Sequence, residues 1–259
     1  MNQNERRRYL IGRLLEESPR YRGAEIPQSE GEQRDLLRSL MNVRPPREAD
    51  ADFLAVQDEY LREAIARRGI TDLGELTPVR DRLYLWQGDI TTLRCGAIVN
   101  AANSALLGCF RPLHTCIDNC IHTYAGVQLR LKCAELMDAQ GHEEPTGRAK
   151  ITPAYNLPSE YVIHTVGPIV DGPLTQEHRA QLASCYRACL EAAAEAGCES
   201  IAFCAISTGV FGFPKEAAAE IAIRTVTDWL AARGSGMKVI FTAFSDSSYA
   251  LYQRKLRQA

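Results

Sequence analysis

Three cysteines and two histidines lie within the fifteen-residue segment GCFRPLHTCIDNCIH (residues 108–122). The rest of the 259-residue chain holds only six cysteines and three histidines. A metal site would explain this crowding of soft donor atoms, and so would a small buried cluster on a helix. We set a disulfide aside, because nine cysteines is an odd number and the N-terminal residues do not resemble an export signal.

The spacing Cys-x4-His-x-Cys places Cys109, His114 and Cys116 in a loop that enters a helix. Two thiolates and one imidazole form a donor set that favours zinc. Three protein ligands leave a fourth position for water or substrate, which is typical of a catalytic site. Cys120 and His122 follow closely, and we expect them to pack the helix against a sheet. A fourth ligand from either residue would instead close the site.

The segment STGVFGFP (residues 207–214) follows an apolar strand pattern and precedes a helical one. Gly209 and Gly212 permit close backbone approach, and successive N–H groups can converge on an anion. The N-terminus of the next helix adds partial positive charge. The lysine of a nucleotide-triphosphatase loop is missing, so the segment indicates another kind of phosphate cradle. A simple strand-to-helix turn is the alternative.

Other polar or aromatic residues follow expected strands and could serve a nucleotide. Asp89 could accept a hydrogen bond from an exocyclic amine such as that of adenine, although an aspartate before a turn often caps the backbone. Asn100 and Asn103 offer amide groups to sugar hydroxyls, and asparagine is also favoured in turns. Phe244 could stack on a base or belong to the core.

Apolar strand patterns alternate with amphipathic helical patterns from Leu83 to the C-terminus. Strands are expected within residues 82–90, 95–103, 149–158, 161–168, 200–208 and 238–245. Helices are expected over residues 116–139, 174–197, 215–234 and 247–259, with Gly197 ending the second of them. This alternation predicts a sheet covered on both faces, with ligands beyond the carboxyl ends of its strands.

Residues 1 to about 80 differ in composition from the rest of the chain. They are rich in arginine and glutamate, and their apolar residues fall at helical spacing. We expect three helices there, with a capping box at Ser29 and Glu32 and a break at Pro45 and Pro46. An extension that covers one face of the main domain is the favoured interpretation. A separate partner-binding module is the alternative.

The composition excludes some classes of function. Net charge is −2 with a pI of about 6.2, so no bulk attraction to nucleic acid or to an anionic membrane is expected. No apolar run approaches the roughly 20 residues that cross a bilayer. The expectation of reduced thiols supports the cytoplasmic location that the family resemblance described below implies.

The motifs GDIT, IVNAAN, YVIHTVGP and ISTGVFGFP occur in this order and closely resemble the macrodomain family over about residues 80–258. The resemblance implies a three-layer α/β/α sandwich with a mixed central sheet over residues 80–259. An N-terminal helical extension over residues 1–79 would precede it. The family binds ADP-ribose, which is therefore the expected ligand.

The resemblance also implies roles for individual residues. Asp89 would hold the adenine amine, Phe244 would lie against the adenine, residues 207–213 would wrap the diphosphate, and Asn103 would face the distal ribose. The implied ADP-ribose-binding residues are Asp89, Ile90, Asn103, Ser207, Thr208, Gly209, Val210, Phe211, Gly212, Phe213 and Phe244.

The segment GCFRPLHTCIDN is similar to the motif of the zinc-dependent macrodomain branch, G-C-F-x-P-x-H-x-C-I-D-N. This similarity implies one Zn²⁺ per chain, bound by Cys109, His114 and Cys116. It also implies a hydrolase that removes ADP-ribose from modified protein side chains. Asn103 and Asp118 would be catalytic, with Asn103 fixing the sugar and Asp118 acting as a base or a ribose anchor. A lipoyl-carrier protein is the protein substrate that the resemblance suggests.

Three other functions are weighed beside this one. A non-catalytic ADP-ribose reader would need the phosphate loop and Asp89 but no metal. A hydrolase of O-acetyl-ADP-ribose would use the same pocket on a small molecule. A nucleic-acid binder would need a basic face, and the nearly neutral charge argues against it.

Overall fold

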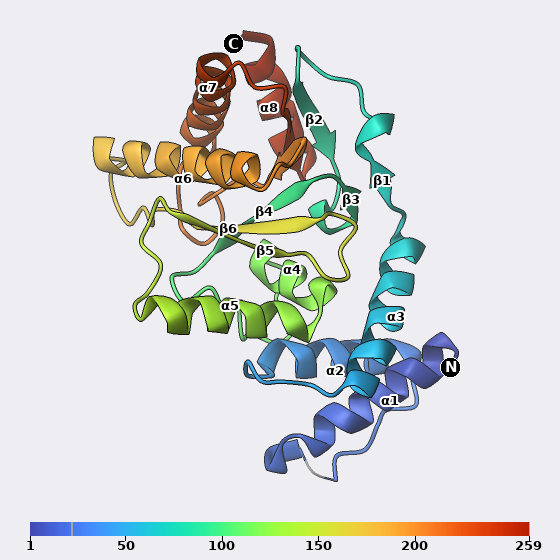
Figure 1. The fold of residues 1–259 in the computed structure, drawn as a ribbon. Helices are drawn as coiled ribbons and strands as arrows, with labels where there is room; N and C mark the ends of the chain where they lie inside the picture. The colour runs from blue at the N-terminus through green and yellow to red at the C-terminus, as the bar shows by residue number, and fades with distance from the viewer. Residues whose placement is uncertain (22, 259) are drawn as a thin grey trace.

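The computed structural model describes residues 1–21 and 23–258. It shows a six-stranded sheet in the order β2-β8-β7-β4-β6-β5, parallel throughout except for β5, which runs antiparallel to β6 (Figure 1). The strands are β2 (Leu83–Gln87), β4 (Ala97–Ala102), β5 (Ala149–Pro153), β6 (Tyr161–Val166), β7 (Ser200–Phe203) and β8 (Lys238–Ala243). β1 (Thr71–Asp72) and β3 (Leu93–Arg94) form a separate parallel pair. The mixed sheet that the family resemblance implies is confirmed.

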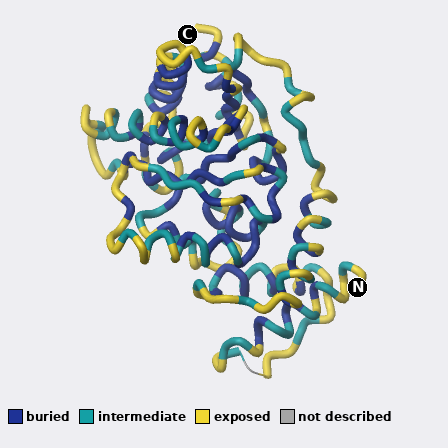
Figure 2. The backbone as a smooth tube through the Cα atoms, viewed as in Figure 1, coloured by how far each residue is buried: buried dark blue, intermediate teal, exposed yellow. Residues whose placement is uncertain are grey.

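Helices cover both faces of this sheet. They are α4 (Ile117–Ala125), α5 (Val127–Gln140), α6 (Gln176–Glu195), α7 (Lys215–Arg233) and α8 (Asp246–Gln258). Successive side chains of a strand point to opposite faces. Ala97 and Val99 of β4 therefore pack with α6, α7 and α8, whereas Ile98 packs with α4 and α5. Figure 2 shows the resulting buried centre between the two helical layers, which confirms the three-layer sandwich.

Four aromatic rings run through the core on the α6–α8 side. Phe203 of β7 lies between Tyr186 and Phe241, with ring centroids 4.9 and 6.5 Å away, and Phe241 stacks on Tyr252 at 5.3 Å. All four side chains are buried. This contact fixes α6 and α8 against neighbouring strands, and so fixes the strand ends where loops emerge.

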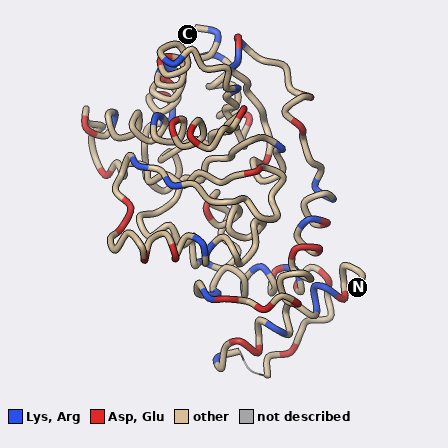
Figure 3. The backbone as a smooth tube through the Cα atoms, viewed as in Figure 1, with Lys and Arg blue, Asp and Glu red and all other residues tan. Residues whose placement is uncertain are grey.

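Three helices precede the sheet, as the sequence predicts: α1 (Gln3–Glu16), α2 (Glu30–Val43) and α3 (Ala51–Arg68). They share an apolar core that includes Leu37 and Phe53 and extends to Val127 of α5. Ser29 caps α2 by accepting from the Glu32 amide, but only this half of the expected capping box is found in the described residues. Figure 3 shows basic and acidic residues mingled along these helices.

The helix predicted over residues 116–139 is wrong in one respect, because it divides at Gly126 into α4 and α5. Gly126 has φ +100°, and a Cβ there would lie 2.7 Å from side-chain atoms of Gln57 and Gln128. The Gln57 Oε1 atom accepts from the Val127 N–H at 2.9 Å. The Gln57 side chain of α3 therefore packs against the break and accepts one of its backbone N–H groups.

The described part of the chain contains no helix with the length and apolar character needed to cross a membrane.

Replacing Phe203 with alanine should lower the free energy of unfolding by about 3–5 kcal/mol, because a large void would open inside the aromatic stack. The Ile169→Ala variant is the control, since Ile169 is 61% exposed and should change stability by no more than about 0.5 kcal/mol. Urea denaturation measures both. Equal losses in the two variants would contradict this view of the core.

Candidate active site and metal centre

The loop between β4 and α4 brings three soft donor atoms together. The Cys109 Sγ lies 3.4 Å from the His114 Nδ1, and these atoms and the Cys116 Sγ all lie within 4.8 Å of one another. Zn–S bonds of about 2.3 Å and Zn–N bonds of about 2.0–2.1 Å place tetrahedral ligands at similar separations. Two sulfurs and one nitrogen, all half-buried, therefore fit a zinc ion with one position open.

The start of α4 fixes this loop. The Cys116 Sγ caps the helix by accepting from the Asn119 N–H at 3.4 Å. The Asn119 side-chain amide donates to the carbonyl oxygens of Cys109 at 3.1 Å and Arg111 at 3.0 Å. Burial raises the pKa of the Cys116 thiol to about 11. Zinc binding to this thiol would therefore release a proton.

Asp118 lies in the first turn of α4 and is 5% exposed. The Asn100 Nδ2 donates to its Oδ1 at 2.8 Å, and the Asn103 Nδ2 donates to its Oδ2 at 3.4 Å. Asn103 also donates to the Gly108 carbonyl at 3.1 Å, which links the carboxylate to the start of the loop that carries Cys109, His114 and Cys116. Burial raises the pKa of Asp118 to about 6. Asn100 is fully buried behind Asp118, so of the two sugar-binding candidates Asn100 and Asn103 it holds the carboxylate and offers no group to a sugar hydroxyl.

A second buried cluster lies behind Asn100. The Asn100 side-chain nitrogen lies 3.1 Å from the His164 Nδ1, so the Nδ1 atom accepts this hydrogen bond. The His164 Nε2 then carries the proton and donates to the Thr152 Oγ1 at 3.0 Å. The donor atoms of His122 and Cys133 also lie within 4.8 Å of His164. Burial lowers the pKa of both histidines, to about 4 for His164, and raises that of the Cys133 thiol to about 12. Because these three side chains are buried and uncharged, we interpret the cluster as part of the packed core and not as a second metal site.

The loop over residues 207–213 presents unpaired backbone donors. Among the described residues, the N–H groups of Gly209, Val210 and Phe211 have no intrachain acceptor. The turn requires Gly212, which has φ +70° and would place a Cβ 2.8 Å from the Val170 carbonyl. Converging free N–H groups can bind an anion. Phe213 is 2% exposed and packs in the core, so only its backbone could face a ligand.

The loops after β2 and β8 lie side by side, since these strands pair in parallel. The Asp89 Oδ1 accepts from the Thr91 N–H at 2.9 Å, and its other oxygen pairs with Arg68 of α3. Phe244 is 84% exposed directly after β8, whereas Ile90 is buried and could offer only its backbone. Arg68 was not predicted, because a helix-surface arginine carries no recognisable signal in a single sequence.

All of these loops meet at one edge of the sheet. Parallel strands β2, β4, β7 and β8 bring their carboxyl ends to the same edge, where ligands of such sheets bind. The loop after β6 joins them, because the Val170 N–H donates to the Phe211 carbonyl at 2.8 Å. An exposed aromatic ring, free backbone donors and a candidate metal-binding loop beside a buried carboxylate therefore share one side of the molecule.

Comparisons with known proteins identify the family of the chain. The profile of the Macro domain family matches residues 99–222. A protein from Treponema medium named "Protein-ADP-ribose hydrolase" is 59% identical over 258 residues, 98% of this chain and 99% of the relative. The chain belongs to the macrodomain family. Its curated relatives are hydrolases, and the chain is a hydrolase as well.

Solved structures support the fold. A mutant of the Oceanobacillus iheyensis macrodomain "with ADPR" is 39% identical, with a TM-score of 0.63, over 71% of this chain and 96% of that one. A Trypanosoma brucei macrodomain "in complex with ADP-ribose" is 28% identical, with a TM-score of 0.65, over 83% and 94% of the two chains. The expected macrodomain sandwich is confirmed.

Stability should depend on pH through His164. The unfolded chain binds a proton near the ordinary histidine pKa of about 6.5, whereas the buried ring stays neutral down to about pH 4. Unfolding free energy should therefore decrease as pH falls. Between pH 7 and pH 5 this residue should account for about 2 kcal/mol of that decrease.

The His164→Gln variant should lose this contribution, so its urea-denaturation stability should fall less steeply with pH than that of the wild type. Exposed His142 supplies the matched control, His142→Gln. Parallel pH curves for wild type and His164→Gln would contradict the assignment.

Proposed function

We propose that this chain is a zinc-dependent protein-ADP-ribose hydrolase that removes ADP-ribose from modified protein side chains. The observation that carries the proposal is the Cys109–His114–Cys116 donor cluster in a loop tied to Asp118 through Asn103. The name of the Treponema medium relative and the ADP-ribose complex of the Trypanosoma brucei macrodomain support the substrate.

The ligand would lie along the carboxyl edge of the sheet. Phe244 offers an exposed ring for the adenine. Asp89, beside its bonds to Thr91 and Arg68, would accept a hydrogen bond from the adenine amine. The free N–H groups of residues 209–211 hold the diphosphate. These contacts, remote from the reacting bond, supply binding energy that positions the distal ribose.

Asp118 and Asn103 would hold the distal ribose. The Asp118 carboxylate already accepts from two amides, and it keeps lone pairs for a sugar hydroxyl. Cys109, His114 and Cys116 would hold zinc, whose chemistry here is Lewis acidity toward an oxygen beside the ribose. The reaction belongs in the cytoplasm, where the thiol ligands stay reduced. A lipoyl-carrier protein is the first modified acceptor to test.

The Cys109→Ala variant should lose zinc and lose about 100-fold or more of its ADP-ribose release, because two protein ligands hold the metal poorly. Free ADP-ribose should still bind. Release from a mono-ADP-ribosylated protein, measured with and without chelator beside elemental analysis of zinc, tests this.

The control is Cys198→Ala, which removes a buried thiol just before β7. This variant should keep both zinc and activity. Unchanged turnover of Cys109→Ala would remove the metal from the mechanism. Bound zinc in the wild type with no release from any acceptor would make the protein a reader.

The Phe244→Ala variant should weaken ADP-ribose binding roughly 5- to 100-fold, the usual effect of losing one base–aromatic stack. Stability should not change, because the ring is 84% exposed. Calorimetric titration of wild type, Phe244→Ala and Phe244→Tyr measures this, and the tyrosine variant should keep most of the affinity. Equal affinities in all three would place the adenine elsewhere.

A further inference from the structure

Two polar side chains of α2 contact the metal-binding loop (residues 109–116) from outside the sandwich. The Arg38 Nη2 donates to the His114 carbonyl at 2.8 Å and to the Asn119 Oδ1 at 3.1 Å. One helical turn later, the Asn42 Oδ1 accepts from the Leu113 N–H at 3.0 Å. Both contacts reach the main chain beside the histidine ligand.

The contact at Asn42 falls on a strained part of the loop. Leu113 has φ +57°, a conformation that is unfavourable for a residue with a side chain. Asn42 is 1% exposed, and its Nδ2 donates to the Thr123 Oγ1 of α4 at 2.9 Å. A single buried amide therefore fixes both the loop and α4, and its loss would leave the Leu113 N–H without a partner.

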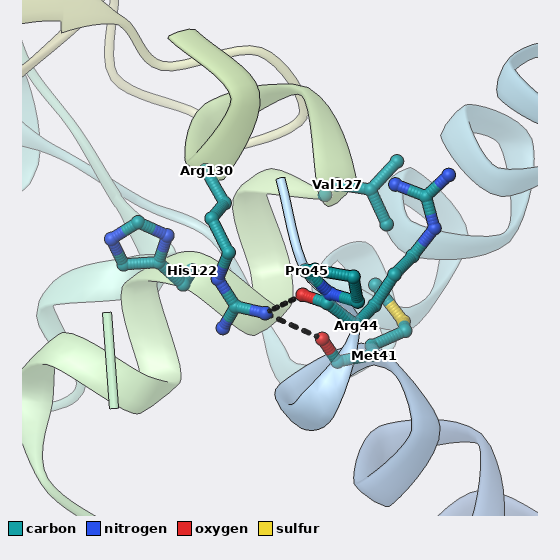
Figure 4. Close-up of a pocket in the computed structure, with 7 residues that line it drawn as sticks. Met41, Arg44, Pro45, His122, Val127 and Arg130 are labelled. Atoms are coloured by element: carbon teal, nitrogen blue, oxygen red, sulfur yellow. Dashed lines mark hydrogen bonds between the residues drawn. The ribbon is translucent and has the colours of Figure 1, made fainter. Parts of the chain in front are cut away.

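The C-terminal end of α2 is joined to the start of the same loop region. Arg130 of α5 donates to the Met41 carbonyl at 3.2 Å and to the Arg44 carbonyl, the two contacts drawn in Figure 4. Its Nε donates to the Leu107 carbonyl at 2.7 Å, and its guanidinium lies over the Phe110 ring at 4.3 Å. The loop is thus connected to α2 at two separate places.

We propose that α2 positions the metal-binding loop, with Arg38 and Asn42 as positioning residues that hold His114 toward the two cysteine thiols. A helix that only covered a surface would make apolar contacts with it. Here a buried amide, Asn42, and a half-buried guanidinium, Arg38, which are 71 and 76 residues away in the chain, are directed at consecutive loop residues. The consequence for zinc rests on the proposed function, whereas the effect on loop order does not.

The test compares Asn42→Ala with a matched control, Gln57→Ala. Gln57 is also a buried amide of the N-terminal helices and accepts a backbone N–H, but it does so from Val127 of α5. Both variants remove one such bond. The full-length proteins are compared for Zn²⁺ affinity by competition with a chromophoric chelator, and for hydrogen exchange of the metal-free loop.

Asn42→Ala should weaken Zn²⁺ binding about 10-fold or more, within the range for groups that orient metal ligands. The same variant should also speed hydrogen exchange of the Leu113 N–H in the metal-free protein, because this group loses its acceptor. Gln57→Ala should change Zn²⁺ affinity less than about two-fold, and Arg38→Lys should fall between them, since lysine lacks the planar fork.

Equal Zn²⁺ affinities in Asn42→Ala and Gln57→Ala, with unchanged exchange at Leu113, would overturn the positioning role while leaving the hydrolase intact. A wild type that binds no Zn²⁺ would overturn the metal claim of the proposed function, and the exchange comparison would still decide whether α2 orders the loop.

Discussion

A buried carboxylate is stable only if hydrogen bonds replace the water it has lost, and Asp118 satisfies this requirement through Asn100 and Asn103. These two amides come from β4 and the residue just after it, so they fix the start of α4 close to the end of β4. The chain between them must then turn within a short distance. Positive φ values at Leu106, Gly108 and Leu113 are the result. The donor cluster forms inside this constrained turn.

The N-terminal helices contact the loops at the same edge of the sheet. Arg38 contacts the candidate metal-binding loop. Arg68 pairs with Asp89, and its guanidinium carbon lies 4.1 Å from the Tyr124 ring centroid. Their shared apolar core also includes Val127 of the sandwich. The boundary at residue 79 stays a prediction, but the segment before it contacts both the candidate metal-binding loop and Asp89, the candidate adenine-binding residue.

Much of the fold could be predicted because alternating strand and helix patterns report burial directly. The edge where loops gather followed from parallel topology alone. The break at Gly126 was missed because the helical pattern continues through it, and the Gln57 side chain that contacts the break lies about 70 residues away in the chain. Arg38, Asn42 and Arg68 were missed for the same reason. Their partners are set by tertiary packing, which leaves no local signal in one sequence.

The most direct test of this account is X-ray absorption at the zinc edge of the purified protein. The account predicts two sulfur atoms at about 2.3 Å, one imidazole nitrogen at about 2.0–2.1 Å and one oxygen atom in the coordination shell. That result would show an open site formed by Cys109, His114 and Cys116. A third sulfur atom would make Cys120 a ligand and close the site, and that result would contradict the catalytic assignment.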